Sequence, residues 1–109
     1  MIYFSKENTD LPTIKYPLFM VDMNLSITAK LVYALLFDRA ADRKTAETYG
    51  RIYVTFTIKD LSECIGKSEM TVKNSLKILE EKGLIKRKSK GVGKPTHIFI
   101  LYPNDEKTK

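Results

Sequence analysis

A run of basic residues near the C-terminus has the clearest chemistry in this sequence. From Lys82 to Asn104 the chain carries six Lys or Arg side chains and no carboxylate. These six charges equal the formal net charge of the whole chain, +6, which results from 19 basic and 13 acidic residues. Because concentrated Lys and Arg attract phosphate groups, the run indicates contact with a nucleic-acid backbone. Lysines that only keep the surface solvated are the alternative interpretation.

Two glycines divide this run and predict a tight hairpin, residues 84–102, which we call the wing. Gly91 and Gly93 let the backbone turn sharply and approach a phosphate closely. Side chains alternate across a strand, so either Arg87 or its two neighbours face a groove, but not both sets. A protein-binding edge is the alternative role for this hairpin. The wing side chains predicted to contact phosphates are Arg87, Lys88, Lys90 and Lys94.

An amphipathic helix is predicted immediately before the wing, over residues 68–82. Ser68 is a good N-cap, and Gly83 is suited to ending the helix. At about 100° per residue, the side chains that share the inward face are Val72, Leu76 and Leu79. The opposite face is therefore expected to meet solvent or a partner.

The outward face of this helix carries side chains that can read DNA. In helix-turn-helix proteins the N-terminal half of the second helix enters the major groove. There Asn can pair with adenine, Lys with guanine and Glu with cytosine, and Thr or Met can contact a thymine methyl. The side chains predicted to reach base edges are Ser68, Glu69, Met70, Thr71, Lys73 and Asn74, and those predicted to contact phosphates are Lys67 and Lys77. A solvated face with pairs such as Lys77–Glu81 is the alternative, since residues 59–81 hold 4 basic and 5 acidic side chains.

A shorter helix precedes this one and completes a helix-turn-helix pattern. Thr57 and Asp60 fit a capping box, with Asp in place of the usual Glu. Gly66 suits the position just after a helix end, two residues before the next N-cap. The inward face is predicted to hold Ile58, Leu61 and Ile65, with Cys64 beside them as a buried structural thiol. Two short helices joined by a tight glycine turn are typical of a helix-turn-helix.

The remaining elements predict a winged helix-turn-helix, an α+β fold with three helices and a small antiparallel sheet. Ser26 is expected to cap a central helix, and the helix formers from Ala29 to Ala41 are apolar almost all round. The polar residues 38–50 are the expected loop, and β-branched and aromatic residues predict strands. These strands are Arg51–Phe56, Leu84–Ser89 and Thr96–Tyr102.

Three segments are predicted along the chain: an N-terminal arm (1–24), the winged-helix domain (25–103) and a polar tail or linker (104–109). The arm contains Pro12 and Pro17 and shows no helical period, which predicts an extended, partly strand conformation. Its apolar side chains are expected to pack on the domain or, as the alternative, on a second subunit.

Length and composition limit the class of protein. A chain of 109 residues with 43% hydrophobic and 29% charged residues is typical of one globular domain. The pI of about 9.4 indicates an anionic partner, nucleic acid before membrane. No apolar run approaches the ~20 residues of a membrane span, the N-terminus is not a signal peptide, and there is 1 cysteine. These limits predict a cytoplasmic protein without a membrane segment.

Enzymatic interpretations find no support in the sequence. His97 is the single histidine and lies in an apolar strand, where a structural or surface role is expected. No Cys/His set has metal-ligand spacing. The glycines of the wing are not followed by the Ser or Thr and the helix of a phosphate-binding loop. We therefore predict no catalytic residue, no cofactor and no metal.

Several strings of residues resemble the N-terminal domain of the RepA_N family, the replication initiators of plasmids in low-GC Gram-positive bacteria. The resemblance spans residues 12–103. It is carried by Tyr16–Phe19, Leu25–Arg39, Gly50–Val54, Leu79–Ile85 and Gly91–Pro95. The string from Leu25 to Tyr33 and the Gly-x-Gly-Lys-Pro wing are moderately specific, whereas LEEKGLI recurs in many winged helices.

The resemblance implies a function and a partner. It implies sequence-specific binding of double-stranded DNA at repeated sites (iterons) of a plasmid origin, as a homodimer, through the second helix and the wing. Family members normally carry a further C-terminal domain that contacts the replication machinery, whereas this sequence ends at Lys109. An excised domain and a shortened homologue remain alternatives. A stand-alone regulator that binds a palindromic operator, and a protein-interaction module, are the other functions considered.

Overall fold

The described part of the chain forms three α-helices, one short 3-10 helix and four strands. The computed structural model describes residues 3–7, 10–42, 46–48, 50–89, 91 and 96–102, and for residues 46–48 only the backbone. In chain order the elements are η1 (Leu18–Met20), α1 (Ile27–Ala41), β1 (Ala46–Thr48), β2 (Arg51–Thr55), α2 (Ile58–Ile65), α3 (Glu69–Glu81), β3 (Ile85–Lys88) and β4 (His97–Ile100). Among these residues no helix is long and apolar enough to cross a membrane.

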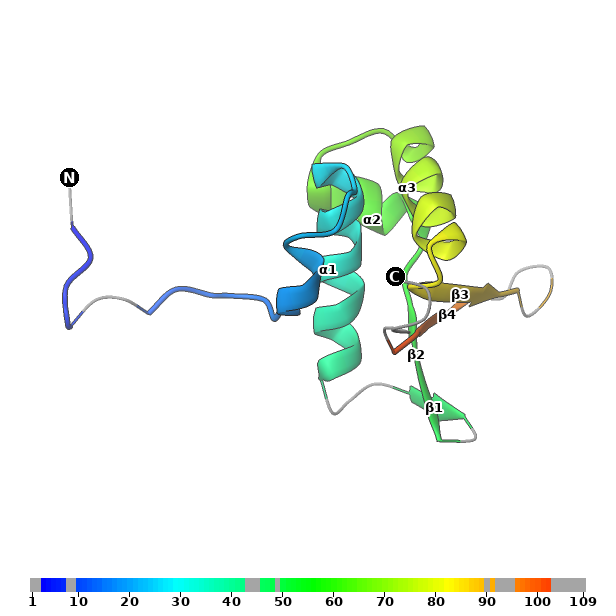
Figure 1. The fold of residues 1–109 in the computed structure, drawn as a ribbon, viewed down its shortest axis with the longest axis horizontal. Coiled ribbons are helices and arrows are strands. Elements are labelled where there is room, and N and C mark those ends of the chain that lie inside the picture. Colours follow the sequence, from blue (N-terminus) through cyan, green and yellow to red (C-terminus); the bar gives the residue numbers. More distant parts are fainter. Residues whose placement is uncertain are drawn as a thin grey trace.

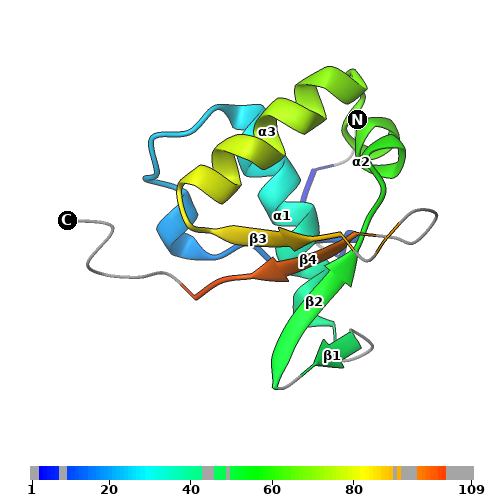
Figure 2. The same cartoon turned by 90° about the vertical axis from the view of Figure 1, so that its right-hand side faces the viewer.

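The strands form a single antiparallel sheet in the order β1-β2-β4-β3. Helix α1 packs on β2 and β4, and α3 packs on both α1 and β3. Figures 1 and 2 show α1 and α3 together on one side of the sheet, so the described helices leave the other side uncovered. The winged helix-turn-helix predicted from the sequence is therefore confirmed.

The hydrophobic core lies between α1, α3 and the helix-facing side of the sheet. Tyr33 is buried in this core, with its ring 6.2 Å from that of Phe19 and 6.0 Å from that of Phe37. Burial raises the pKa of Tyr33 to about 12, and the nearby Tyr16 hydroxyl adds to the increase. The largest fully buried side chains are Tyr33, Met20, Leu36, Leu61, Leu76, Leu79, Ile85 and Ile98.

Helix α1 begins where the sequence predicted and ends within the predicted loop. The hydroxyl of Ser26 accepts a hydrogen bond from the N–H of Ala29 at 3.1 Å. The helix continues to Ala41, and two polar residues in its last turns make tertiary contacts. The carboxylate of Asp38 accepts from the backbone N–H of Lys15 at 2.9 Å, and the guanidinium of Arg39 lies over an aromatic ring.

The loop prediction for residues 38–50 was therefore too long. Residues 38–41 are helical, and residues 46–48 form β1, which pairs antiparallel with β2. A three-residue strand has no pattern of its own to reveal it, because its conformation depends on pairing with a partner strand.

Among the described residues of the N-terminal arm, those at its C-terminal end anchor it to the domain. Met20 is fully buried, and Tyr16 and Phe19 pack against the core. Residues 18–20 form the 3-10 helix η1, and the described part of the arm contains no strand, so the strand expected there is not formed. Residues 3–7 and 10–14 are exposed and project away from the helices (Figure 1).

Candidate nucleic-acid interface

Helix α3 is positioned by signals at both of its ends. The tight turn before it is closed by Gly66, whose φ of +69° lies in the left-handed region that glycine favours. The hydroxyl of Ser68 accepts from the N–H of Thr71 at 3.2 Å and satisfies a free donor of the first turn. At the other end, the N–H of Leu84 donates to the carbonyl of Leu79 at 3.0 Å, a pattern typical of a glycine-ended helix.

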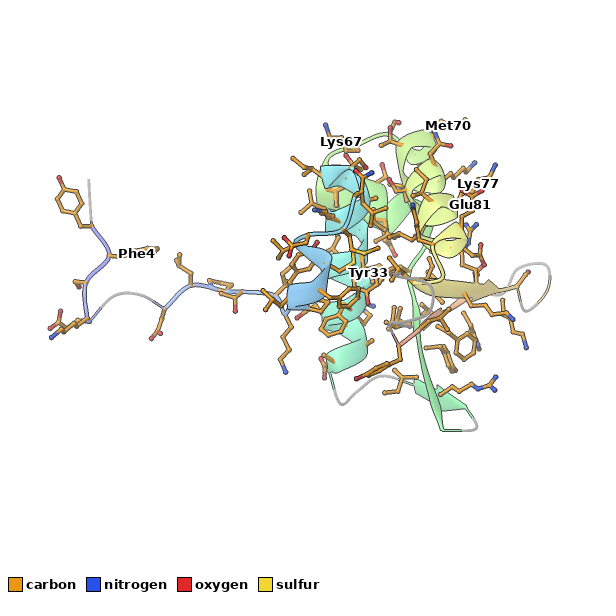
Figure 3. All side chains as sticks on the ribbon, viewed as in Figure 1. Phe4, Tyr33, Lys67, Met70, Lys77 and Glu81 are labelled. Carbon is orange, nitrogen blue, oxygen red and sulfur yellow. The ribbon has the colours of Figure 1, made fainter. Side chains whose placement is uncertain are left out.

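The inward and outward faces of α3 are those that the sequence predicted. Val72, Leu76 and Leu79 are buried, and Ser75 lies beside them. The exposed predicted DNA contacts of α3 and the turn before it are Lys67, Ser68, Glu69, Met70, Lys73, Asn74 and Lys77. Figure 3 shows Met70, Lys77 and Glu81 on the side of α3 that points away from α1. A ligand therefore has access to this face along the length of the helix.

Two of the predicted base contacts, Ser68 and Thr71, form the N-terminal cap of the helix. The hydroxyls of Ser68 and Thr71 are 2.9 Å apart and share a hydrogen bond. Thr71 is half-buried. Both side chains thus hold the first turn of α3, and its free N–H groups make this end favourable for a phosphate.

Lys67 lies in a turn whose backbone is held by hydrogen bonds to Ser62 of α2. The hydroxyl of Ser62 donates a short hydrogen bond to the carbonyl of Lys67, and the N–H of Lys67 donates to the carbonyl of Ser62 at 3.2 Å. The backbone of this lysine is thus held on α2 while its side chain remains exposed. Lys77 is exposed as well, and it forms no ion pair with Glu81 in the described structure.

Arg87, one of the predicted phosphate contacts, is paired with a carboxylate within the protein. Its guanidinium contacts the Glu80 carboxylate of α3 through Nε at 3.1 Å and Nη2 at 3.0 Å. In β3 the alternation of side chains places Arg87 toward the helices and Lys86 and Lys88 on the open side. The two sets therefore face opposite sides, as predicted, and Arg87 is the member turned inward.

The same contact lowers the pKa of Glu80. The backbone N–H of Arg87 donates to the other carboxylate oxygen at 3.0 Å, and this bond is the largest cause of the decrease. The guanidinium of Arg87 adds to it, and partial burial of the carboxylate opposes it. One carboxylate thus joins α3 to the first strand of the wing.

The tip of the wing lies mostly outside the described residues. Lys90 and Lys94 are among the residues that are not described, and so is Gly93. Gly91 has a φ of +115°, a conformation that L side chains rarely adopt. The base of the wing is fixed by the pairing of Lys88 with His97 across β3 and β4.

A row of aromatic rings on the open side of the sheet was not singled out in the sequence. The rings of Tyr53 and His97 stack at 3.8 Å with an angle of 12°, and the ring of Phe99 lies 5.6 Å from that of Tyr53. The structural role expected for His97 fits this stacking. Alternation along β2 and β4 was the available signal, because residues 53, 97 and 99 share one face once the strands are paired in register.

The sequence matches a known protein family over most of its length. Residues 18–108 match RepA_N, the family of the replication initiator protein A (RepA) N-terminus. None of the curated proteins matches the sequence.

Solved structures with the same fold cover nearly the whole chain. One is described as the N-terminal domain of a DNA-binding protein, with a TM-score of 0.71 and 24% identity over 99% of this chain and 90% of that one. A second is the structure of a Rep–DNA complex, with a TM-score of 0.69 and 26% identity over 94% and 85%. A third is described as an MDR initiator, with a TM-score of 0.68 and 23% identity over 95% and 88%.

Proposed function

This chain belongs to the RepA_N family, the N-terminal part of replication initiator protein A, and from that we propose that it binds duplex DNA sequence-specifically at a plasmid replication origin. Helix α3 acts as the recognition helix in the major groove, and the wing contacts the flanking backbone. The observation that carries the proposal is the exposed outer face of α3, held at a fixed angle by the turn at Gly66 and the contacts to the wing. The similar Rep–DNA complex supports it.

Base reading is assigned to the exposed side chains in the first half of α3. Asn74 and Lys73 offer donors for purine edges, Glu69 offers an acceptor for cytosine, and Met70 offers an apolar contact. Ser68 and Thr71 contribute at the helix N-terminus, where their hydroxyls fix the first turn. Sequence preference thus depends on the part of α3 that enters the groove first.

Phosphate contact is assigned to lysines on either side of this helix. Lys67 and Lys77 flank the recognition face, and Lys88 is exposed at the base of the wing. The lysines proposed for the tip of the wing are Lys90 and Lys94. Arg87 has a positioning role, because its guanidinium holds the wing against α3 through Glu80.

The protein acts by binding, as a homodimer in the cytoplasm, and we assign it no catalytic step. The exposed apolar side chains of the N-terminal arm support self-association, since such groups on a monomer often mark an interface. They are Tyr3, Phe4, Leu11 and Ile14. Contact with the replication machinery is proposed for a further C-terminal domain.

Selection of bound duplexes from a randomised library tests this function. Enrichment of a directly repeated motif is the expected result and fits iteron recognition. An inverted repeat with half-sites about one helical turn apart would favour the transcriptional regulator instead. No enrichment of any sequence would overturn sequence-specific binding.

A variant pair makes the test specific for α3. Asn74→Ala is expected to relax the preference at one base position and to weaken binding about tenfold or more. Lys6→Ala removes one charge from the exposed arm, far from α3 in Figure 1, and serves as the control. Equal effects of the two substitutions would remove α3 from the proposed interface.

A further inference from the structure

The open side of the sheet combines aromatic rings and cations in adjacent positions. In register, Lys86 of β3 lies opposite Phe99 of β4, which lies opposite Tyr53 of β2. In the next row Lys88 lies opposite His97. Figure 2 shows α1 and α3 on the other side of β3 and β4, so the described helices leave this face uncovered. The face is distinct from the outer side of α3.

The rings on this face form a continuous row. Tyr53 stacks on His97 at 3.8 Å, and Phe99 continues the row 5.6 Å from Tyr53 at an angle of 51°. All three side chains are half-buried, so their inner edges are packed and their outer parts are accessible. A flat, aromatic ligand can extend such a row by stacking.

Cations border the row beside a hollow in the surface. The hollow has a volume of about 400 Å³, and its walls include Phe99, Tyr102, Arg51, Lys86 and Lys88. None of the described residues that line it is acidic. The described structure records no ion pair for these three cations, and Tyr102 is 92% exposed. The site therefore offers positive charge and ring faces within one concave surface.

We propose that this face binds single-stranded DNA. Aromatic side chains stack on bases, and neighbouring Lys and Arg follow the phosphates, which is how proteins bind single strands without reading their sequence. A duplex cannot use the rings in this way, because its base faces are already stacked on each other. A second copy of this face is a poor occupant, since it would bring the same three cations against their equivalents.

This inference rests on the proposed function at an origin, where strands are separated before replication. The two surfaces then act on two forms of the same DNA. The recognition helix and wing hold the duplex, and the sheet holds an unpaired strand next to it. Lys88 lies at the junction, since it belongs both to the base of the wing and to the wall of the hollow.

The test measures binding of the full chain to a labelled oligothymidine of about 20 nucleotides by fluorescence anisotropy, with an origin-derived or library-selected duplex measured alongside. Phe99→Leu and Lys86→Ala are the informative variants, because leucine keeps the apolar contact with the sheet but removes the ring. Each is expected to weaken oligothymidine binding about tenfold or more, and Phe99→Leu, which changes no cation, is expected to leave duplex affinity unchanged. Circular dichroism confirms that each variant is folded.

Two controls separate this proposal from the duplex site. Asn74→Ala is expected to weaken the duplex and leave oligothymidine binding unchanged, and Lys6→Ala is expected to change neither. Loss of binding to both DNA forms in Phe99→Leu, or no binding of oligothymidine by the unmodified protein, would overturn the sheet site. If the unmodified protein bound the duplex but not oligothymidine, the proposed function would stand without the sheet site. Tenfold tighter binding of oligouridine than oligothymidine would overturn the assignment to DNA.

Discussion

The carboxylate of Glu80 accepts three hydrogen bonds from Arg87, one from its backbone N–H at 3.0 Å and two from its guanidinium at 3.1 and 3.0 Å. Glu80 belongs to α3 and Arg87 to β3, the first strand of the wing. Hydrogen bonds to the guanidinium alone would fix only the end of a flexible side chain. The backbone bond also fixes the strand, so the two proposed DNA-binding elements are joined at one point.

Removal of this carboxylate is expected to destabilise the fold. Glu80→Ala leaves the Arg87 N–H and guanidinium without their partner, and we expect a loss of about 1–2 kcal/mol in the free energy of unfolding. Chemical denaturation measures this loss. Glu81→Ala, one residue later on the exposed face, is the matched control and is expected to be nearly neutral. Equal losses in both variants would contradict the role of the contact.

The same contact predicts a dependence of stability on acid. In the folded state the pKa of Glu80 lies below its ordinary value of 4.5. Its contribution to stability is therefore present above pH 4.5 and is lost as the pH falls through the folded-state pKa. Glu80→Gln should therefore lose less stability than the unmodified protein when the pH is lowered from 5 toward 2, roughly the range in which paired carboxylates protonate. Thermal unfolding at a series of pH values checks this. Parallel curves for the two proteins would show that Glu80 does not contribute.

The raised pKa of Tyr33 predicts that the folded protein loses stability in alkali. Its pKa is raised from 10.0 to about 12 by burial, so the folded state keeps the proton that the unfolded state releases. The stability linked to this residue is complete below pH 10 and is lost as the pH rises toward 12. Tyr33→Phe should flatten the decline in that range, although lysines titrate there in both proteins. Denaturation curves from pH 9 to about 11.5 measure the difference.

Phosphate contact by the tip of the wing predicts a change in salt dependence. The double substitution of Lys90 and Lys94 by Ala should weaken duplex binding for all sequences alike. It should also reduce the slope of log K against log salt by about 1.8, since each lost phosphate contact accounts for about 0.9. Titrations at several salt concentrations measure the slope. An unchanged slope would assign these lysines to solubility.

The exposed part of the arm predicts an effect on assembly without an effect on folding. Deletion of residues 1–15 removes Tyr3, Phe4, Leu11 and Ile14 but keeps the buried Met20. We expect the same circular dichroism spectrum and fewer subunits per particle in sedimentation at equal concentration, with each mass divided by that of its own chain. An unchanged number of subunits would exclude the arm from the interface.

Local signals explain why the helix-turn-helix could be predicted from the sequence. The caps at Ser26, Thr57 and Ser68 bond within three residues along the chain, and Gly66 needs only its own backbone conformation. The spacing of apolar residues predicted the buried face of α3, because this spacing is also a property of the local sequence. One local expectation failed: Cys64 is exposed, because at about 100° per residue it lies roughly a quarter turn from the centre of the face formed by Ile58, Leu61 and Ile65.

Features that depend on pairing between distant segments could not be predicted in this way. Strand β1 exists through its pairing with β2, and Arg87 turns inward because Ile98 lies opposite it on the core side of β4. The aromatic row needs three residues from two strands in a specific register. A single sequence gives the alternation within each strand but not which strands are neighbours.

The link between α3 and the wing also has a consequence for the DNA. Because the helix and the hairpin are held at one spacing, the protein in the proposed complex cannot adjust to each site by moving one element against the other. The duplex has to adopt the groove width and bend that fit this spacing, and the cost of doing so depends on the stiffness of its base steps. Preferences at base pairs that no side chain touches are therefore expected alongside those read directly.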